Sequence, residues 1–304
     1  MKILKRMIFI FVMSVFFLFF LSSASQGQGL KFGLKFTGGM NYQLFGDGDA
    51  ILKAQKAASE DFINKYSGYT IDNPLIPLFS HFGLDFEADA ILYLSPQFGL
   101  SLGTGYIQAG TIFGSDDSII TSSVSRETGS YDIKASATPI KVGIYYNFSS
   151  IFSPKGKSSS YLYAGIGFYS AKYSVLEKWN FVNGSQSDWS TYEEKSKAKG
   201  IGFHGGLGAE SWLGPNFALI FEIFGRYANI GGFKGDWQSN SKGGMSSGSG
   251  TLYFFEWMDS RFGSWYPGTH VLSSSPSGPN VRNVREAKIN FSGVGIRLGM
   301  KINF

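Results

Sequence analysis

Alternation of apolar and polar residues dominates the chain after residue 30. A period of two is typical of β-strands whose two faces meet different environments. Eight segments show it, and each is long enough to cross a bilayer as a tilted strand, which needs about 9–11 residues. The segments are 31–45, 81–94, 98–113, 131–148, 161–173, 199–213, 217–227 and 294–304.

The segment 131–148 changes phase along its length. Ile133 and Ala135 fall on one face, whereas Ile140 and Val142 fall on the other. Pro139 stands at the change, and proline inside a sheet is mostly confined to edges and bulges. We therefore expect a β-bulge at Pro139, which would shift the following residues to the opposite face.

The connections between the segments alternate in length. Those over 95–97, 149–160 and 213–216 are short, whereas those over 46–80, 114–130, 174–198 and 231–287 are long and polar. A transmembrane barrel has this arrangement, with short turns on the periplasmic side and long loops outside. We expect all four long connections to be extracellular loops.

The first long connection contains a predicted helix over residues 50–66. Asp49 is expected to cap its start and Gly68 to end it. One face of this helix is apolar. That face comprises Ile51, Ala54, Ala58, Phe62 and Tyr66.

Charged residues on the polar faces of the strands indicate which face points outward. If the apolar faces look into lipid, the polar faces line a lumen, where charges of both signs can pair. Aromatic residues such as Tyr42, Phe98 and Tyr106 near the strand ends are typical of membrane-interface girdles. The residues expected in the lumen are Lys35, Asp85, Glu87, Asp89, Lys141, His204, Glu210, Glu222, Arg226 and Arg297.

The pattern therefore predicts an all-β fold. We expect an antiparallel up-and-down transmembrane barrel of about eight strands, with long extracellular loops, one of which carries a short helix. The alternative is a secreted soluble barrel of the lipocalin type, whose apolar face points inward.

Composition and the N-terminus support export to a membrane. The chain has 40 glycines, 17% aromatic residues and only 16% charged residues, against about 25% charged in soluble domains. Residues 1–27 have a basic start, an apolar block and small residues before a cleavage site after Ala24 or Gly27, the order of a signal peptide. We expect residues 28–304 to form a single barrel domain.

Charge and cysteine content exclude several classes of protein. The formal net charge of +5 falls to near +2 once Lys2, Lys5 and Arg6 leave with the signal, and no basic run follows, so no nucleic-acid partner is expected. The absence of cysteine excludes disulfides, thiol catalysis, Cys-based zinc sites and a lipid-modified cysteine.

The last strand carries a resemblance to a known family. The ending GVGIRLGMKINF (293–304), with alternating apolar residues and a terminal Phe, resembles the C-terminal insertion signal of Gram-negative outer-membrane proteins. The segments FGLSLGTGY (98–106) and TPIKVGIYY (138–146) are similar to strands of the small OmpA-like, OmpX-like and OmpW-like barrels.

This resemblance implies a place in the cell and two partners. It implies the outer membrane, with outer-membrane lipid around the barrel and recognition of the last strand by the barrel-assembly machinery. We expect no peptidoglycan-binding domain of the full OmpA type, and the last loop is longer than in the smallest barrels. The implied signal residues are Leu298, Met300, Ile302 and Phe304.

Two function classes fit the predicted lumen. An eight-stranded barrel is just wide enough for side chains to fill it. A lumen plugged by ion pairs leaves a structural or surface-interaction role. A narrow porin-like channel or small-solute transporter lined by the same residues is the alternative, since the many inward glycines would leave space for water.

Signs of catalysis are sparse. The chain has three histidines, His81, His204 and His270, and no HExxH, GxSxG or P-loop motif. We expect no catalytic residue, metal or cofactor. Because some outer-membrane enzymes that modify lipids use His and Ser on a barrel, such an enzyme stays a distant alternative.

The last long connection is rich in aromatic residues. Exposed Trp and Tyr are favoured at binding interfaces. They are candidates for contact with an extracellular ligand, and the competing interpretation is a lid folded over the barrel mouth. The candidates are Trp237, Trp257, Trp265 and Tyr266.

Overall fold

The computed structural model describes residues 31–66, 70–72, 81–110, 116–121, 125–149, 158–183 and 185–304. The expected signal peptide lies outside these residues. Strands make up most of the described chain, together with the helix α2 (Gly48–Lys65). The strands are β1 (Lys31–Gln43), β2 (Thr70–Asp72), β3 (Phe82–Tyr93), β4 (Phe98–Gly110), β5 (Asp116–Thr121), β6 (Ser125–Ser149), β7 (Ser158–Asn183), β8 (Gln186–Trp212), β9 (Phe217–Tyr227), β10 (Asn229–Ile230), β11 (Lys234–Ser241), β12 (Gly244–Asp259), β13 (Ser264–Leu272), β14 (Val281–Glu286), β15 (Ile289–Asn290) and β16 (Gly293–Asn303).

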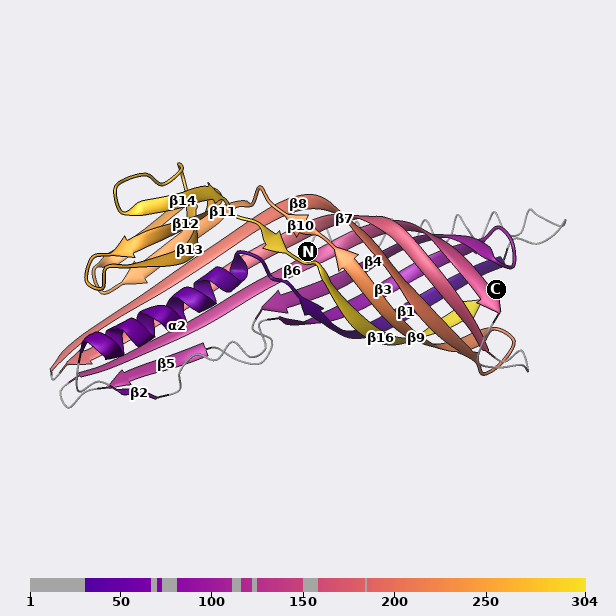
Figure 1. Ribbon diagram of the computed structural model, residues 1–304, viewed down its shortest axis with the longest axis horizontal. Helices are drawn as coiled ribbons and strands as arrows, with labels where there is room; N and C mark the ends of the chain where they lie inside the picture. The colour runs from indigo at the N-terminus through magenta and orange to yellow at the C-terminus, as the bar shows by residue number, and fades with distance from the viewer. Residues whose placement is uncertain are drawn as a thin grey trace.

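Eight strands close into a ring in the order β1-β3-β4-β6-β7-β8-β9-β16, and β16 returns to pair with β1 (Figure 1). Every pairing in this ring is antiparallel. The ring is built from all eight predicted segments, so the predicted barrel is confirmed. A closed ring has no free edge, and each of its strands is hydrogen-bonded on both sides.

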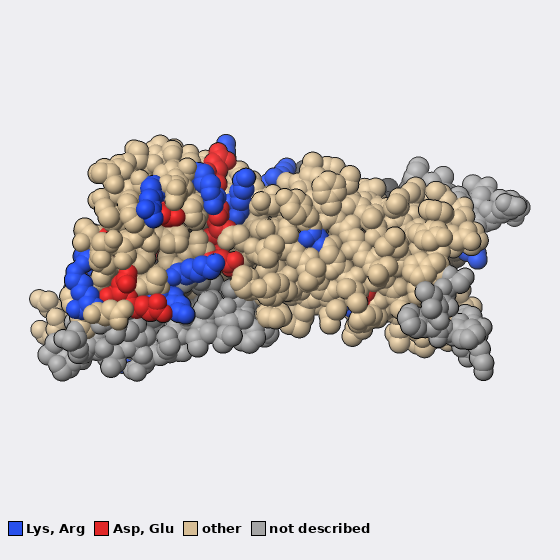
Figure 2. Space-filling model, viewed as in Figure 1, with Lys and Arg blue, Asp and Glu red and all other residues tan. Residues whose placement is uncertain are grey.

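The outer surface of the ring is an apolar belt. Large apolar side chains point away from the barrel and stay exposed, and Figure 2 shows almost no charge over the ring strands on the face in view. Lys, Arg, Asp and Glu gather instead over the other half of that face (Figure 2). The belt includes Phe36, Met40, Phe86, Leu100, Leu102, Ile140, Val142, Ile144, Leu162, Ile166, Ile201, Phe203, Leu207, Leu219, Phe221, Ile223, Ile296 and Leu298.

Three strands continue far beyond the ring. The strands β6, β7 and β8 have 25, 26 and 27 residues, whereas β1, β3, β4, β9 and β16 have 11 to 13. Their continuation (125–137, 171–183 and 186–198) forms a sheet with β5 and β2 on one side and β11, β12, β13 and β14 on the other. This sheet and α2, which packs against β13, are called the extension below (Figure 1).

Three of the predicted loops are therefore wrong. The stretch 114–130 contains β5 and the start of β6, 174–198 is the tip of one long β7–β8 hairpin, and 231–287 contains β11 to β14. Their polar composition is what makes them resemble loops. Strands of the extension meet water on one face and only a small core on the other, which weakens the contrast between the two faces.

The polarity of the interior inverts between the ring and the extension. On one face of β6, Lys141 and Tyr145 point into the lumen, and further along the same face Ile133, Ala135 and Ala137 join an apolar core. The strand keeps one continuous register against β7 through this change, so the predicted bulge at Pro139 is wrong. The phase change in the sequence marks the point where the inner face leaves the polar lumen.

The predicted helix over 50–66 corresponds closely to α2. Its N-cap is Asp47 and not Asp49, and Asp47 makes no side-chain capping hydrogen bond. Its carboxylate instead accepts hydrogen bonds of 2.6 Å from both terminal nitrogens of Arg285, which joins the helix start to β14. No helix among the described residues is long and apolar enough to cross a bilayer.

Substitution of two isoleucines on β6 tests the inversion of interior polarity between the ring and the extension. Ile133 is fully buried in the extension core, whereas the Ile144 side chain on the belt is 57% exposed. Ile133→Ala should lower the free energy of unfolding by about 2–4 kcal/mol, because truncation leaves a cavity. Ile144→Ala should cost under about 1 kcal/mol in detergent, measured by urea titration. Equal losses would contradict the inversion.

Candidate functional site

Ten charged side chains from six strands meet inside the ring. Five are acidic and five are basic, so the described part of the lumen has no formal net charge. Nine of them were predicted from the alternation. The tenth, Lys301, shares the inward face of β16 with Arg297, and the same alternation points to it. The ten are Lys35 on β1, Asp85, Glu87 and Asp89 on β3, Lys141 on β6, Glu210 on β8, Glu222 and Arg226 on β9, and Arg297 and Lys301 on β16.

Glu222 and Arg297 form the centre of this network. The Glu222 carboxylate accepts hydrogen bonds of 2.6 Å from Lys35 Nζ and of 2.6 Å from the Tyr161 hydroxyl. Arg297 Nη1 lies 3.4 Å from the second Glu222 oxygen and also donates to Glu87. Arg297 Nε lies 3.0 Å from Asp85 Oδ1, so one guanidinium connects carboxylates from two strands.

The remaining pairs extend the network around the lumen. Lys35 Nζ also lies 3.0 Å from Asp89, and Lys141 contacts both Glu87 and Asp89. Arg226 Nη1 lies 2.5 Å from Asp85. Each of these carboxylates therefore has at least one cationic partner. Pairing of this kind is what makes buried charges tolerable, since an unpaired buried charge costs several kcal/mol.

A second group of hydrogen-bonded side chains lies beside this network, toward the end of the barrel where the chain terminates. Lys301 donates to the Glu210 carboxylate, which also accepts hydrogen bonds from the Tyr145 hydroxyl (3.1 Å) and the Ser159 hydroxyl (2.9 Å). The Tyr145 ring stacks on Tyr161 with centroids 4.4 Å apart. This group joins Glu210 to the central Glu222 through two tyrosines. Below it a mouth of about 510 Å³ opens, lined by Tyr93, Trp212 and Lys301 among others.

An apolar cluster closes the other end of the lumen. Arg226 Nε donates to the carbonyl oxygen of Phe291 at 2.8 Å, and the Phe291 side chain belongs to an apolar cluster. These side chains are called the apolar cap, and all are fully buried. They are Phe45, Ile230, Phe233, Ile289 and Phe291.

Among the described residues, a small cavity lies between the two ends. It has a volume of about 10 Å³ beside Lys35, Lys141 and Tyr163, roughly the space one water needs. At some inward glycines a larger side chain occupies the adjacent space: a Cβ on Gly208 would lie 2.1 Å from the Tyr161 ring.

The three histidines lie far apart in the fold. His204 reaches the small lumen cavity beside Tyr163 but takes no part in the ion pairs, and its Nδ1 has no hydrogen-bond partner among the described residues. His81 Nδ1 lies 2.9 Å from the carbonyl oxygen of Gln43. His270 belongs to β13 in the extension. The described residues hold no group of three or more His, Cys, Asp or Glu placed to bind a metal.

The aromatic candidates are built into the extension. Tyr266 is buried and donates a 2.5 Å hydrogen bond to Asp61 of α2. Trp257 packs on Tyr266, and Trp237 stacks on Tyr192 with centroids 6.1 Å apart. The guanidinium of Arg282 lies 4.2 Å from the ring of Trp265. These contacts favour a structural role for the rings within the extension over four free binding residues.

A buried acid lies beneath these rings. Glu194 on β8 accepts hydrogen bonds of 2.8 Å from the Tyr192 hydroxyl and from the backbone N–H of Val271. Burial raises the pKa of Glu194 to about 7 and lowers the pKa of His270, whose Nδ1 lies 3.9 Å away. Burial also raises the pKa of Glu177 on β7 to about 7. The sequence carries no signal for this site, because the polar stretch 174–198 resembles a loop.

The expected insertion-signal residues lie on β16 and at the end of the chain. Leu298, Met300 and Phe304 are exposed on the belt side of the strand. Phe304 exchanges backbone hydrogen bonds with Phe32, and their rings are 6.1 Å apart, so the chain end is held against β1.

Comparisons with known proteins find similarity at the level of solved structures. No family model and no curated protein matches the chain. A major outer-membrane protein from Thermus thermophilus aligns with 12% identity over 91% of this chain and 100% of its own, with a TM-score of 0.34. The outer-membrane protease OmpT from Escherichia coli aligns with 9% identity over 90% of this chain and 97% of its own, with a TM-score of 0.28. At these scores the fold assignment rests on the chain's own strand pairing.

Removal of one charge tests the network. Glu222→Gln should lower the free energy of unfolding by about 3–5 kcal/mol, because Lys35 and Arg297 stay buried with one anionic partner fewer. The matched control is Glu60→Gln on α2, whose ion pair with Lys56 is exposed and should contribute under about 1 kcal/mol. Urea unfolding in detergent, followed on unheated gels, measures both. Equal midpoints for the two variants would contradict the network.

Glu194 predicts a pH dependence of the extension. Its folded-state pKa of about 7 lies above the ordinary value of 4.5, so the folded state binds more protons between these values. The contribution of Glu194 to stability should therefore be full below about pH 4.5 and be lost, by up to about 1.4 kcal/mol per pH unit, as the pH rises to 7. Tryptophan fluorescence during denaturation should show this slope reduced in Glu194→Gln and kept in Glu193→Gln, an outward-facing neighbour. An unchanged slope in Glu194→Gln would exclude this acid as its source.

Proposed function

We propose that this chain is an integral outer-membrane barrel with a sealed lumen, which holds a structured extension at the cell exterior for surface interaction. The observation that carries the proposal is the balanced set of five acidic and five basic side chains that fills the ring. Because its acidic and basic side chains are equal in number, this interior has no net charge that could select cations or anions.

The apolar belt supports placement in a membrane. Large apolar side chains around the whole ring stay exposed, and a water-soluble protein rarely leaves an apolar patch of that size uncovered. The lipocalin-like alternative needs an apolar interior, whereas the ring interior is charged. In lipid, a closed ring also satisfies every backbone polar group.

The arrangement of the connections supports the orientation. The extension lies on the side of the long connections, which face outward in barrels of this type. Both ends of the described ring, at Lys31 and Phe304, lie on the side of the short turns. The extension then presents its polar outer face to the medium, where a protein or glycan partner can reach it.

Two closures support a sealed lumen over the channel. The ion-pair network leaves a cavity of about 10 Å³, and the apolar cap follows it on the extension side. An ion would have to break several paired, desolvated contacts and then pass apolar side chains. The mouth of about 510 Å³ at the opposite end is thus a blind vestibule.

Conductance recording tests the sealed lumen. We expect the mature chain to shift on a gel when heated, as folded barrels do, and to give no discrete current steps in planar bilayers. Charge reversal through Glu222→Lys or Arg226→Glu should lower stability, because a paired charge is replaced by a repelling one. Steps in the wild type whose ion selectivity changes with these reversals would establish a channel and overturn the proposal.

A further inference from the structure

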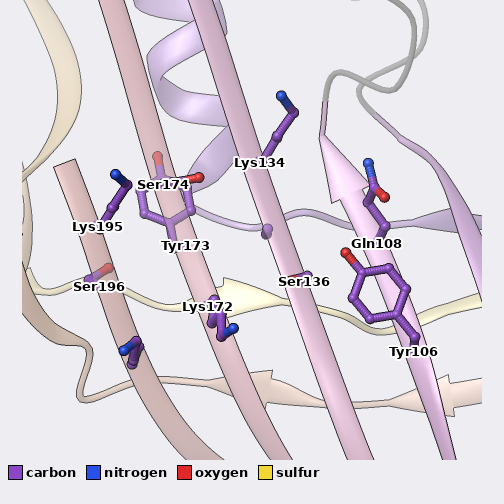
Figure 3. Close-up of a pocket in the computed structure, with 11 residues that line it drawn as sticks. Tyr106, Gln108, Lys134, Ser136, Lys172, Tyr173, Ser174, Lys195 and Ser196 are labelled. Carbon is purple, nitrogen blue, oxygen red and sulfur yellow. The ribbon is translucent and has the colours of Figure 1, made fainter. Parts of the chain in front are cut away.

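A groove lies on the outer face where the extension leaves the ring. It runs across β4, β6, β7 and β8 and has a volume of about 480 Å³. Figure 3 shows its side chains on the strands, with a helix behind the sheet. The lining side chains that matter below are Tyr106, Lys134, Ser136, Lys172, Lys195 and Lys197.

The groove concentrates positive charge from neighbouring strands. Lys172 of β7 stands directly opposite Lys197 of β8, and Lys197 stands directly opposite Lys234 of β11. These three lysines form one row across the sheet, and all are exposed. Like charges directly opposite each other on a sheet are destabilising. The row therefore gains stability from any anion that binds over it.

Acidic side chains neutralise only two of the lysines that line the groove. Lys134 pairs with Asp132, Lys195 pairs with Glu193, and Asp236 of β11 stands opposite Lys195. Among the described residues, Lys172, Lys197 and Lys234 have no carboxylate within ion-pair distance. Lys172 and Lys197 in the groove, and Lys234 beside them on β11, thus keep their positive charge.

The position of the groove relative to the belt indicates the kind of anion. On β7 the last belt residue is Phe168, four residues before Lys172, and on β8 it is Ile201, four residues after Lys197. Four residues span about 13 Å along a strand, or roughly 10 Å along the membrane normal at the usual tilt. Tyr106, at the belt edge of the groove, is a typical interface residue. A molecule in the groove therefore lies level with lipid headgroups.

We propose that this groove binds the phosphate groups of an outer-leaflet lipid headgroup. The inference rests on the proposed membrane placement. Lysines bind phosphate as point charges, and the Ser136 hydroxyl can donate a further hydrogen bond. The acyl chains of such a lipid lie along the belt below Tyr106, where Ile140 and Phe168 point outward. A soluble polyanion has no acyl chains that could contact these apolar side chains.

The test uses lipids that differ in phosphate number. Native mass spectrometry of the full mature chain in detergent measures binding of diphosphoryl lipid A, monophosphoryl lipid A and phosphatidylcholine. We expect the diphosphoryl lipid to bind best. Lys172→Gln combined with Lys197→Gln should weaken it about 10- to 30-fold, since each lysine near a lipid surface contributes about a factor of five. The control, Lys53→Gln with Lys56→Gln on α2, should leave binding unchanged.

Two binding results would overturn the inference. Equal binding of the diphosphoryl lipid by the groove variant and the control would overturn the inference. Displacement of the lipid by millimolar inorganic phosphate would identify free phosphate as the ligand and also overturn it. Flotation with vesicles after a urea wash separates the two proposals: an inserted chain without lipid discrimination refutes only the groove, whereas a chain that fails to float refutes the membrane placement as well.

Discussion

Pairing of buried charges is the constraint on which the rest of the structure depends. The outside of the ring is an apolar belt, so its charged side chains point inward. A lumen filled by side chains offers almost no water to solvate them. The charges must therefore neutralise one another at short distance, as Lys35, Glu222 and Arg297 do. These contacts join strands that are far apart in the sequence and fix the cross-section of the barrel.

In the extension, the same strands have the reverse arrangement: the inner face is apolar and the outer face is polar. Beyond the apolar cap the outer face meets water, so the inner face can be apolar, and Ile133, Tyr173 and Val175 form a conventional core. A strand such as β7 thus carries two patterns in series, polar inside and then apolar inside. The change occurs without a break in pairing, because alternation depends only on the backbone and not on which face is apolar.

The sequence predicts the ring well and the extension poorly, for one physical reason. Large apolar side chains on one face and charged side chains on the other give strong contrast, as in Leu298 beside Arg297, and alternation then locates every ring strand. The extension strands meet water and a narrow core, so β11, with Lys234 and Ser241 at its ends, resembles a loop. Pairings such as Lys35 with Glu222, 187 residues apart, depend on strand register and closure, which composition does not encode.

The long β7–β8 hairpin determines how the outer part of the molecule moves. Its strands have 26 and 27 residues, which at about 3.3 Å per residue is a span of about 85 Å without interruption. The same two strands are part of both the ring and the extension, with no linker between them. Tilting of the extension therefore requires tilting of the ring as well. A force on the tip of the hairpin acts directly on ring strands, because one unbroken ladder of β7–β8 pairs runs from the tip to the ring.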